Sequence, residues 1–131
     1  MNRNTERRLL QIAIGVACLV PFLAGGQGVI EGAAMVKGSG GADLDSHFRY
    51  LSGLLLGIGF GFAACVPAIE RRGAVFRTLG AIAVLGGCAR LLSLLSVGVP
   101  SGGHVFGLCM ELGVVPLLML WQWRVERRFG T

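Results

Sequence analysis

The order of apolar and polar positions divides this chain into four long apolar stretches, separated by short segments rich in arginine, glycine or acidic residues. Each stretch holds about 20 residues, the length that crosses the ~30 Å hydrocarbon core of a bilayer as an α-helix. Lipid offers no hydrogen-bond partner to the peptide groups, so a crossing stretch must satisfy them internally. The pattern therefore predicts an all-α transmembrane four-helix bundle, with helices at about 7–26, 46–68, 74–97 and 103–124.

The composition agrees with a membrane protein. Hydrophobic residues make up 53% of the 131-residue chain and charged residues 15%, whereas a soluble domain carries about 25% charged residues. The mean hydropathy is +0.70. This length allows one domain. We therefore expect residues 1–131 to form a single membrane domain, with the lipid bilayer as its main partner.

Basic residues mark the ends of the apolar stretches, and the formal net charge is +5. The positive-inside rule predicts that both termini are cytoplasmic, in a multi-pass protein of the inner membrane. Arginines spread over helix ends do not form the basic patch that nucleic acid requires, so no nucleic-acid partner is expected. Three of the basic flanks repeat the tripeptide Glu-Arg-Arg, at 6–8, 70–72 and 126–128. The arginines that flank this one side of the four-span chain are Arg3, Arg7, Arg8, Arg71, Arg72, Arg77, Arg124, Arg127 and Arg128.

The cysteines do not indicate a metal or a disulfide framework. Cys18, Cys65, Cys88 and Cys109 lie in four different apolar stretches, without a CxxC or CxxH pair. Zinc sites and disulfide frameworks need clustered ligands, so these residues are interpreted as small packing side chains. The sequence predicts no metal site and no cofactor.

Glycine positions predict close helix packing. Gly53, Gly57 and Gly61 recur every four residues in the helix at 46–68, and Gly86 and Gly87 lie together in the helix at 74–97. Small residues at such positions let a neighbouring backbone approach.

Two prolines predict helix kinks, and the residues that end the longest loop predict a helix cap. Pro21 and Pro116 lie inside the first and fourth predicted helices, and each removes a backbone N–H, so a kink is expected at both. The longest connection is a periplasmic loop at 27–45. At its end, Asp45 or Ser46 can cap the next helix by accepting its first backbone N–H groups.

Arg90 places a guanidinium inside an apolar run and needs a partner. It lies about seven residues, or ~10 Å, from the end of the helix at 74–97, and Glu111 lies as far inside the helix at 103–124. A hairpin that turns near Pro100 brings both side chains to the same depth. An unpaired arginine at membrane depth costs about 2.5 kcal/mol or more. The sequence therefore predicts a contact of Arg90 with Glu111, either direct or through one water or a bound headgroup.

Further polar residues occur near the membrane surface at which the hairpin is predicted to turn, close to Pro100. Ser93 shares the helix face of Arg90, and Asp45 lies four residues before Arg49, a spacing at which two side chains meet on a helix. The predicted cluster opens outward and comprises Asp45, His47, Arg49, Arg90, Ser93, His104 and Glu111.

Four interpretations of this cluster are open. A structural clasp would lock the hairpin of the last two helices, because paired charges fix helix register. A headgroup site would hold an anionic or polar head on Arg49 and Arg90, with the tail between helices. A metal site on His47, His104 and a carboxylate lacks ligand spacing, and catalysis lacks a nucleophile–base motif. The clasp is favoured.

Three stretches resemble a known family: DSHFRYLSGLLLG at 45–57, GGCARLLSLLSVGVP at 86–100 and ELGVVP at 111–116. They resemble the domain of unknown function 4345 family of small four-span bacterial membrane proteins. The resemblance covers about residues 40–125 and implies a four-helix membrane protein, without implying an activity. The residues that carry it are Arg49, Gly53, Gly86, Gly87, Arg90, Ser93, Pro100, Glu111 and Pro116.

The favoured function is that of a non-enzymatic accessory or interaction subunit, which works through helix packing in a membrane assembly or a homo-oligomer. The small mass predicted outside the membrane and the lack of catalytic spacing favour it. The alternative is the binding or transport of a lipophilic molecule with a polar head (a lipid, a quinone or a hydrophobic toxin) at a site on Arg90 and Glu111.

Overall fold

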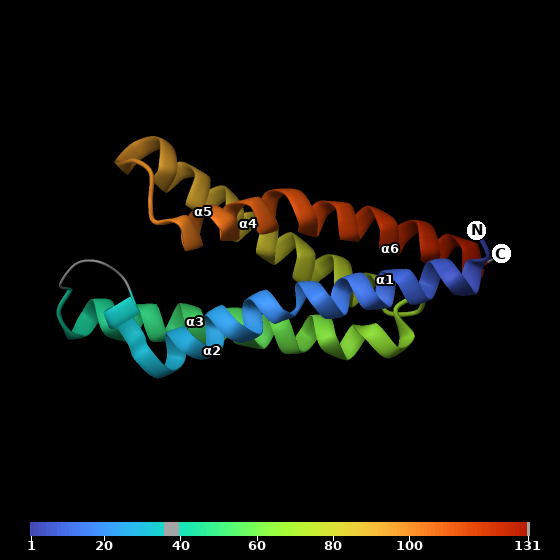
Figure 1. The fold of residues 1–131 in the computed structure, drawn as a ribbon, viewed down its shortest axis with the longest axis horizontal. Coiled ribbons are helices and arrows are strands. Elements are labelled where there is room, and N and C mark those ends of the chain that lie inside the picture. The colour runs from blue at the N-terminus through green and yellow to red at the C-terminus, as the bar shows by residue number, and fades with distance from the viewer. Residues whose placement is uncertain (36–39, 131) are drawn as a thin grey trace. The chain divides into compact units, whose positions relative to one another are not determined.

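The computed structural model describes residues 1–35 and 40–130, and every regular element in them is a helix. Figure 1 shows these helices in chain order, from blue to red. This result confirms the all-α class and the four segments that the apolar pattern predicts. The segments long and apolar enough to cross a membrane are Arg3–Met35, Ala42–Ala68, Gly73–Val97 and Gly102–Gly130.

The first segment consists of α1 (Arg3–Ala17), α2 (Leu19–Glu31) and the 3₁₀ turn η1 (Gly32–Met35). Pro21 accounts for the break between α1 and α2, because it has no backbone N–H to donate to the carbonyl of Ala17. It becomes the third residue of α2, where a backbone N–H has no partner within the helix. The kink expected at Pro21 is therefore a break, and the segment extends beyond the predicted 7–26.

The second segment consists of α3 (Ala42–Cys65) and the 3₁₀ turn η2 (Val66–Ala68). Its N-cap is Gly41, with extended backbone and no side-chain cap, so the predicted cap at Asp45 or Ser46 is wrong. The carboxylate of Asp45 instead accepts the backbone N–H of Ala33 at 2.8 Å. Of the loop predicted at 27–45, residues 36–39 lie outside the described residues. The rest is mainly helical, because α2 and η1 continue into it.

The third segment is α4 (Gly73–Val97), followed by Gly98 with a positive φ of 124° that glycine tolerates. The fourth consists of α5 (Gly102–Cys109), the π-helical turn η3 (Met110–Val114) and α6 (Val115–Gly130). Pro116 accounts for η3, because it cannot donate to the carbonyl of Leu112 and its ring crowds that carbonyl. The kink expected there is thus a widened turn, and Glu111 lies within it.

The chain divides into two compact units. We call Ile12–Val66 the central unit, and Met1–Gln11 together with Pro67–Thr131 the terminal unit. The helix α1 contributes residues to both.

In the central unit, α2 lies beside α3 (Figure 1). A Cβ at Gly25 would stand 2.8 Å from the backbone nitrogen of Leu56, so the two helix backbones touch at this point. Gly28 faces Ser52, which is buried. Small residues of α2 therefore provide most of the room for this close approach.

The glycine stripe predicted on α3 mostly faces away from this contact. A Cβ at Gly57 would have nothing within 4 Å, and one at Gly53 would meet only Val29, at 3.9 Å. Gly59 makes the contact instead, since a Cβ there would stand 3.0 Å from Cγ of Pro21. Gly57 thus has no close neighbour among the described helices, and its predicted role in packing stays a prediction. A four-residue spacing marks one helix face, but the contacting neighbour decides which face packs.

In the terminal unit, α4 packs on η3 and α6 through two glycines. A Cβ at Gly87 would stand 2.8 Å from Cβ of Glu111, and one at Gly80 would stand 2.5 Å from the sulfur of Met119. Within the terminal unit, Gly87 therefore lies at the contact of α4 with η3. A Cβ at Gly86 would have nothing within 4 Å.

Candidate functional site

The predicted contact of Arg90 with Glu111 is present in the terminal unit. Nε of Arg90 lies 2.9 Å from Oε2 and 3.2 Å from Oε1 of Glu111, and Nη1 lies 2.9 Å from Nδ1 of His104. The three residues come from α4, α5 and η3. We call them the Arg90 cluster. It joins the two helical segments on either side of the turn that contains Pro100.

The two partners of Arg90 play different roles. A guanidinium donates hydrogen bonds and accepts none, so in this contact Nδ1 of His104 accepts from Nη1 of Arg90. Glu111 is the carboxylate of the Arg90 cluster and supplies the negative charge opposite the guanidinium.

Gly87 makes room for the Arg90 cluster. Gly87 brings α4 against Glu111, and a Cβ at Gly107 would stand 3.6 Å from Cζ of Arg90, which is ordinary contact distance. The side chain of Glu111 is 16% exposed and that of Arg90 is 35% exposed. The carboxylate is therefore enclosed by the helices, while the guanidinium is partly open.

The other predicted site residues lie elsewhere. Ser93 and His47 are exposed. In the central unit, Nε of Arg49 lies 2.8 Å from Asp45, and its Nη1 donates to the carbonyls of Val29 and Ile30 at 2.6 and 3.0 Å. Arg49 thus binds the last carbonyls of α2, which have no partner within the helix. The expected pair of Asp45 and Arg49 is present, and a single cavity that also includes the Arg90 cluster stays a prediction.

A second set of polar contacts, which the sequence analysis did not include among the site residues, occurs at the ends of the helices of the terminal unit. Each glutamate of the three Glu-Arg-Arg tripeptides pairs with an arginine from a different chain segment. We call this set the terminal cluster. Its ion pairs are Glu6 with Arg124 (2.8 Å) and with Arg128, Glu70 with Arg7 (3.3 Å), and Glu126 with Arg77.

Gln122 links the terminal cluster to the backbone. Its side chain is fully buried; its amide nitrogen donates to the carbonyl of Ile69 at 3.1 Å, and its amide oxygen accepts from Arg77 at 2.7 Å. The repeated tripeptide was the signal that could have identified this cluster. The sequence analysis used its arginines only to orient the chain in the membrane and gave its glutamates no partners.

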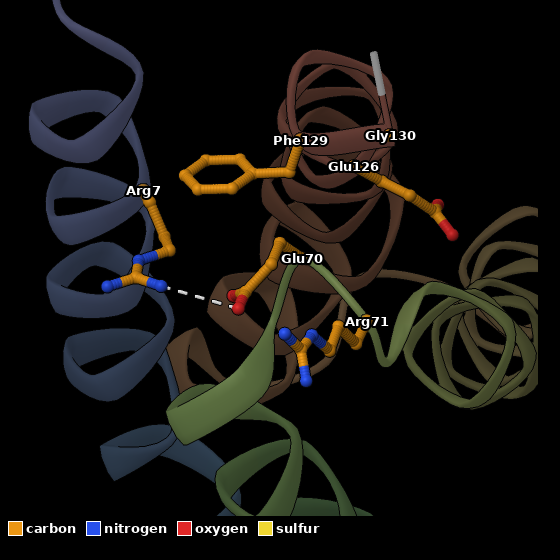
Figure 2. A pocket seen from close by; sticks show the side chains of 6 residues that line it. All are labelled: Arg7, Glu70, Arg71, Glu126, Phe129 and Gly130. Atoms are coloured by element: carbon orange, nitrogen blue, oxygen red, sulfur yellow. Dashed lines mark hydrogen bonds and ion pairs between the residues drawn. The ribbon is translucent and has the colours of Figure 1, made fainter.

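A hollow of about 360 Å³ lies within the terminal cluster. Figure 2 shows the side chains that line it, with Arg7 directed at Glu70 and the ring of Phe129 above them. Among the described residues, no group of three histidine, cysteine or acidic side chains is arranged to hold a metal ion. The hollow is lined by Arg7, Glu70, Arg71, Glu126, Phe129 and Gly130.

These features define an all-helical protein with four segments long and apolar enough to span a membrane, and with charged helix ends. The chain belongs to the family described as domain of unknown function (DUF4345), whose model matches residues 9–122. This match confirms the resemblance found in the sequence. No curated protein and no solved structure matches the chain. The Arg90 cluster lies inside the matched range, but the family description names no activity.

Proposed function

We propose that this protein is a multi-pass protein of a bacterial inner membrane and acts as a non-enzymatic interaction subunit. The exposure of its apolar surface supports the proposal. Each of the four segments contains an apolar stretch of 18 residues, and in chain order only 22%, 22%, 11% and 0% of that stretch is buried. Soluble monomers rarely expose apolar surface on this scale. Lipid, or lipid together with a protein partner, covers it in this proposal.

Both termini are cytoplasmic in this proposal. The contacts of Glu6 with Arg124 and Arg128 support it, because they bring the start of the first segment to the end of the fourth. Such an arrangement needs an even number of crossings. The positive-inside rule then assigns the arginine-rich ends to the cytoplasm.

This topology predicts the activity of reporter fusions. Alkaline phosphatase, which is active only outside the cytoplasm, is expected to be inactive when fused after Thr131. The same enzyme is expected to be active when the chain is cut after Ser101, because three segments then precede it. Colony assays with both fusions measure this. Activity of the fusion after Thr131 would contradict the proposed topology.

Open glycines support packing against another chain. Gly57, Gly86 and Gly113 lie within the predicted spans, and a Cβ at any of them would have nothing within 4 Å. In a membrane such positions allow a second helix to approach closely. The proposal is that these faces contact a second copy of the chain or another membrane protein.

A Gly57→Leu substitution tests this packing. It is expected to weaken self-association in mild detergent by about tenfold, which corresponds to ~1.4 kcal/mol, because the leucine side chain separates the two backbones. Gly103→Leu is the matched control, since it makes the same change at an open glycine near a helix end. Light scattering of the purified variants measures the oligomeric state. A wild-type protein that is monomeric and purifies alone would contradict the proposed function.

The Arg90 cluster acts as a structural clasp in this proposal. The supporting observation is that Nε and Nη1 of the guanidinium already have partners inside the chain. The second candidate is that the cluster binds the polar head of a lipophilic molecule, and the 35% exposure of the Arg90 side chain favours it. The experiments in the Discussion separate the two.

A further inference from the structure

The hollow in the terminal cluster lies where three chain segments meet. Arg7 comes from the first turns of α1, Glu70 and Arg71 precede α4, and Glu126, Phe129 and Gly130 belong to the last turns of α6 (Figure 2). A volume of about 360 Å³ is within the range of small-ligand pockets. All of these residues lie at ends of apolar segments. In a membrane-spanning protein that is the level of the lipid headgroups.

The lining carries both signs of charge. Arg7 and Arg71 supply two guanidinium groups, and Glu70 and Glu126 supply two carboxylates. A simple anion would be repelled by the carboxylates, and a simple cation by the guanidiniums. The lining therefore fits a ligand that carries a negative and a positive group close together.

The four charged groups differ in how many partners they have within the chain. Arg77 pairs with Glu126, whereas Arg71 is exposed and has no ion pair among the described residues. Arg7 and Glu70 share a single hydrogen bond of 3.3 Å. Arg71, Arg7 and Glu70 are thus the groups with remaining capacity for a ligand.

The pair of Arg7 and Glu70 is incomplete. Nε of Arg7 and Oε2 of Glu70 are buried and have no hydrogen-bond partner among the described residues. Leaving such atoms unpaired destabilises an arrangement. Glu70 lines the hollow, and the last side-chain torsion of a glutamate is broad, so its carboxylate can adjust toward a ligand there. A ligand that donates a hydrogen bond to this carboxylate would supply a partner that the described residues do not.

We propose that this hollow binds the phosphoethanolamine headgroup of a bilayer lipid. The phosphate accepts hydrogen bonds from Arg71 and Arg7, and the primary ammonium donates to Glu70. Phe129 forms a wall of the hollow. The guanidiniums of Arg3 and Arg7 lie 5.4 and 5.5 Å from the centroid of its ring. A choline headgroup carries the same charges but has no N–H to donate, and a glycerol headgroup has no cation.

The acyl chains extend toward the membrane interior in this proposal. Leu120 and Trp123, which precede the hollow residues on α6, are 64% and 47% exposed. The proposal rests on the four segments crossing a membrane. It does not depend on self-association or on a protein partner.

Native mass spectrometry of the full-length protein tests the headgroup preference. Phosphatidylethanolamine, phosphatidylcholine and phosphatidylglycerol with identical acyl chains are added to the detergent-solubilised protein. About tenfold tighter binding of phosphatidylethanolamine is expected, the factor that a single charge-assisted hydrogen bond provides. Equal binding of the three lipids would overturn the proposal. Binding of free phosphoethanolamine as tightly as the lipid would overturn the assignment to a lipid.

Two variants locate the binding. Glu70→Gln keeps an oxygen for Arg7 but removes the negative charge, and it is expected to abolish the preference for phosphatidylethanolamine over phosphatidylcholine. Arg71→Gln is expected to weaken binding of both lipids about equally, since both carry the phosphate. Arg72→Gln is the matched control for Arg71, because Arg72 is exposed and does not line the hollow. Thermal unfolding in detergent checks that each variant is folded. A folded Glu70→Gln variant with the wild-type preference would overturn the proposal.

Discussion

Replacing Glu111 with leucine is expected to lower the free energy of unfolding by about 3 kcal/mol, the cost of leaving one member of a buried ion pair alone. Arg90 would lose both carboxylate oxygens, at 2.9 and 3.2 Å, and keep only its contact with His104. If the four segments span a membrane as proposed, the guanidinium then carries an unbalanced charge at membrane depth. Denaturant titration in detergent, followed by the fluorescence of Trp121 and Trp123 in α6, measures the loss.

The double variant Arg90→Leu/Glu111→Leu tests whether the two residues stabilise the fold through their mutual contact. Replacing both members of a buried pair with apolar residues is often nearly neutral, so the double variant is expected to be within about 1 kcal/mol of the wild type. The coupling energy of the cycle is then about 2 kcal/mol or more, as for residues in contact. Additive losses from the two single substitutions would contradict a direct interaction of Arg90 with Glu111.

The lipids and quinones bound to the purified protein distinguish a clasp from the second candidate function, a headgroup site. If the Arg90 cluster is only a clasp, the folded double variant retains the same bound lipids and quinones as the wild type. Loss of one lipophile from this folded variant would favour the headgroup site on Arg90. Native mass spectrometry after mild detergent extraction gives this comparison. Leu92→Ala serves as the control, since Leu92 is exposed on α4 and has no charged partner.

The substitution Glu6→Ala is expected to lower the free energy of unfolding by about 2 kcal/mol, the scale of hydrogen bonds to charged groups. Glu6 is only 2% exposed and accepts hydrogen bonds from both Arg124 and Arg128. Its removal leaves two arginines close together without their shared anion. It also removes one of the contacts between the two ends of the chain, whereas Arg3 and Arg7 still lie over the ring of Phe129.

The loss at Glu6 has a local signature as well. Hydrogen exchange is expected to increase in the first turns of α1 and the last turns of α6, because the ion pairs hold these helix ends together. Glu31→Ala is the matched control, because Glu31 is an exposed glutamate at the end of α2 whose side-chain partner among the described residues is Gln27. Equal effects of the two substitutions on stability and exchange would show that the Glu6 pairs contribute nothing specific.

Local sequence patterns predicted much of what the structure contains. The apolar stretches located all four helical segments, and Pro21 located the break between α1 and α2. The hairpin register also brought Arg90 opposite Glu111, because depth in a helix follows from residue number at 1.5 Å per residue. These predictions need only the distance along the chain.

Other features depended on neighbours that the sequence does not name. The sequence placed Arg49 in a polar cluster near Asp45, but it did not indicate that Arg49 also binds the carbonyls of Val29 and Ile30. Gly57 was expected in a helix contact, but Gly59 on another face of α3 makes it. A helix turns about 100° per residue, so rotation about its axis decides which residues meet a neighbour.

The sequence by itself therefore determined the all-helical class, the four apolar segments and the register that pairs Arg90 with Glu111. Only the tertiary structure decided the partners of the charges in the terminal cluster. Each Glu-Arg-Arg tripeptide offers the same groups, yet Glu6 binds two arginines of α6 while Glu70 and Glu126 each bind one. The physical reason is that hydropathy and backbone hydrogen bonding depend on residues close in sequence. An ion pair between helices also depends on the rotation of each helix about its axis and on the position of the two residues along the helix axes.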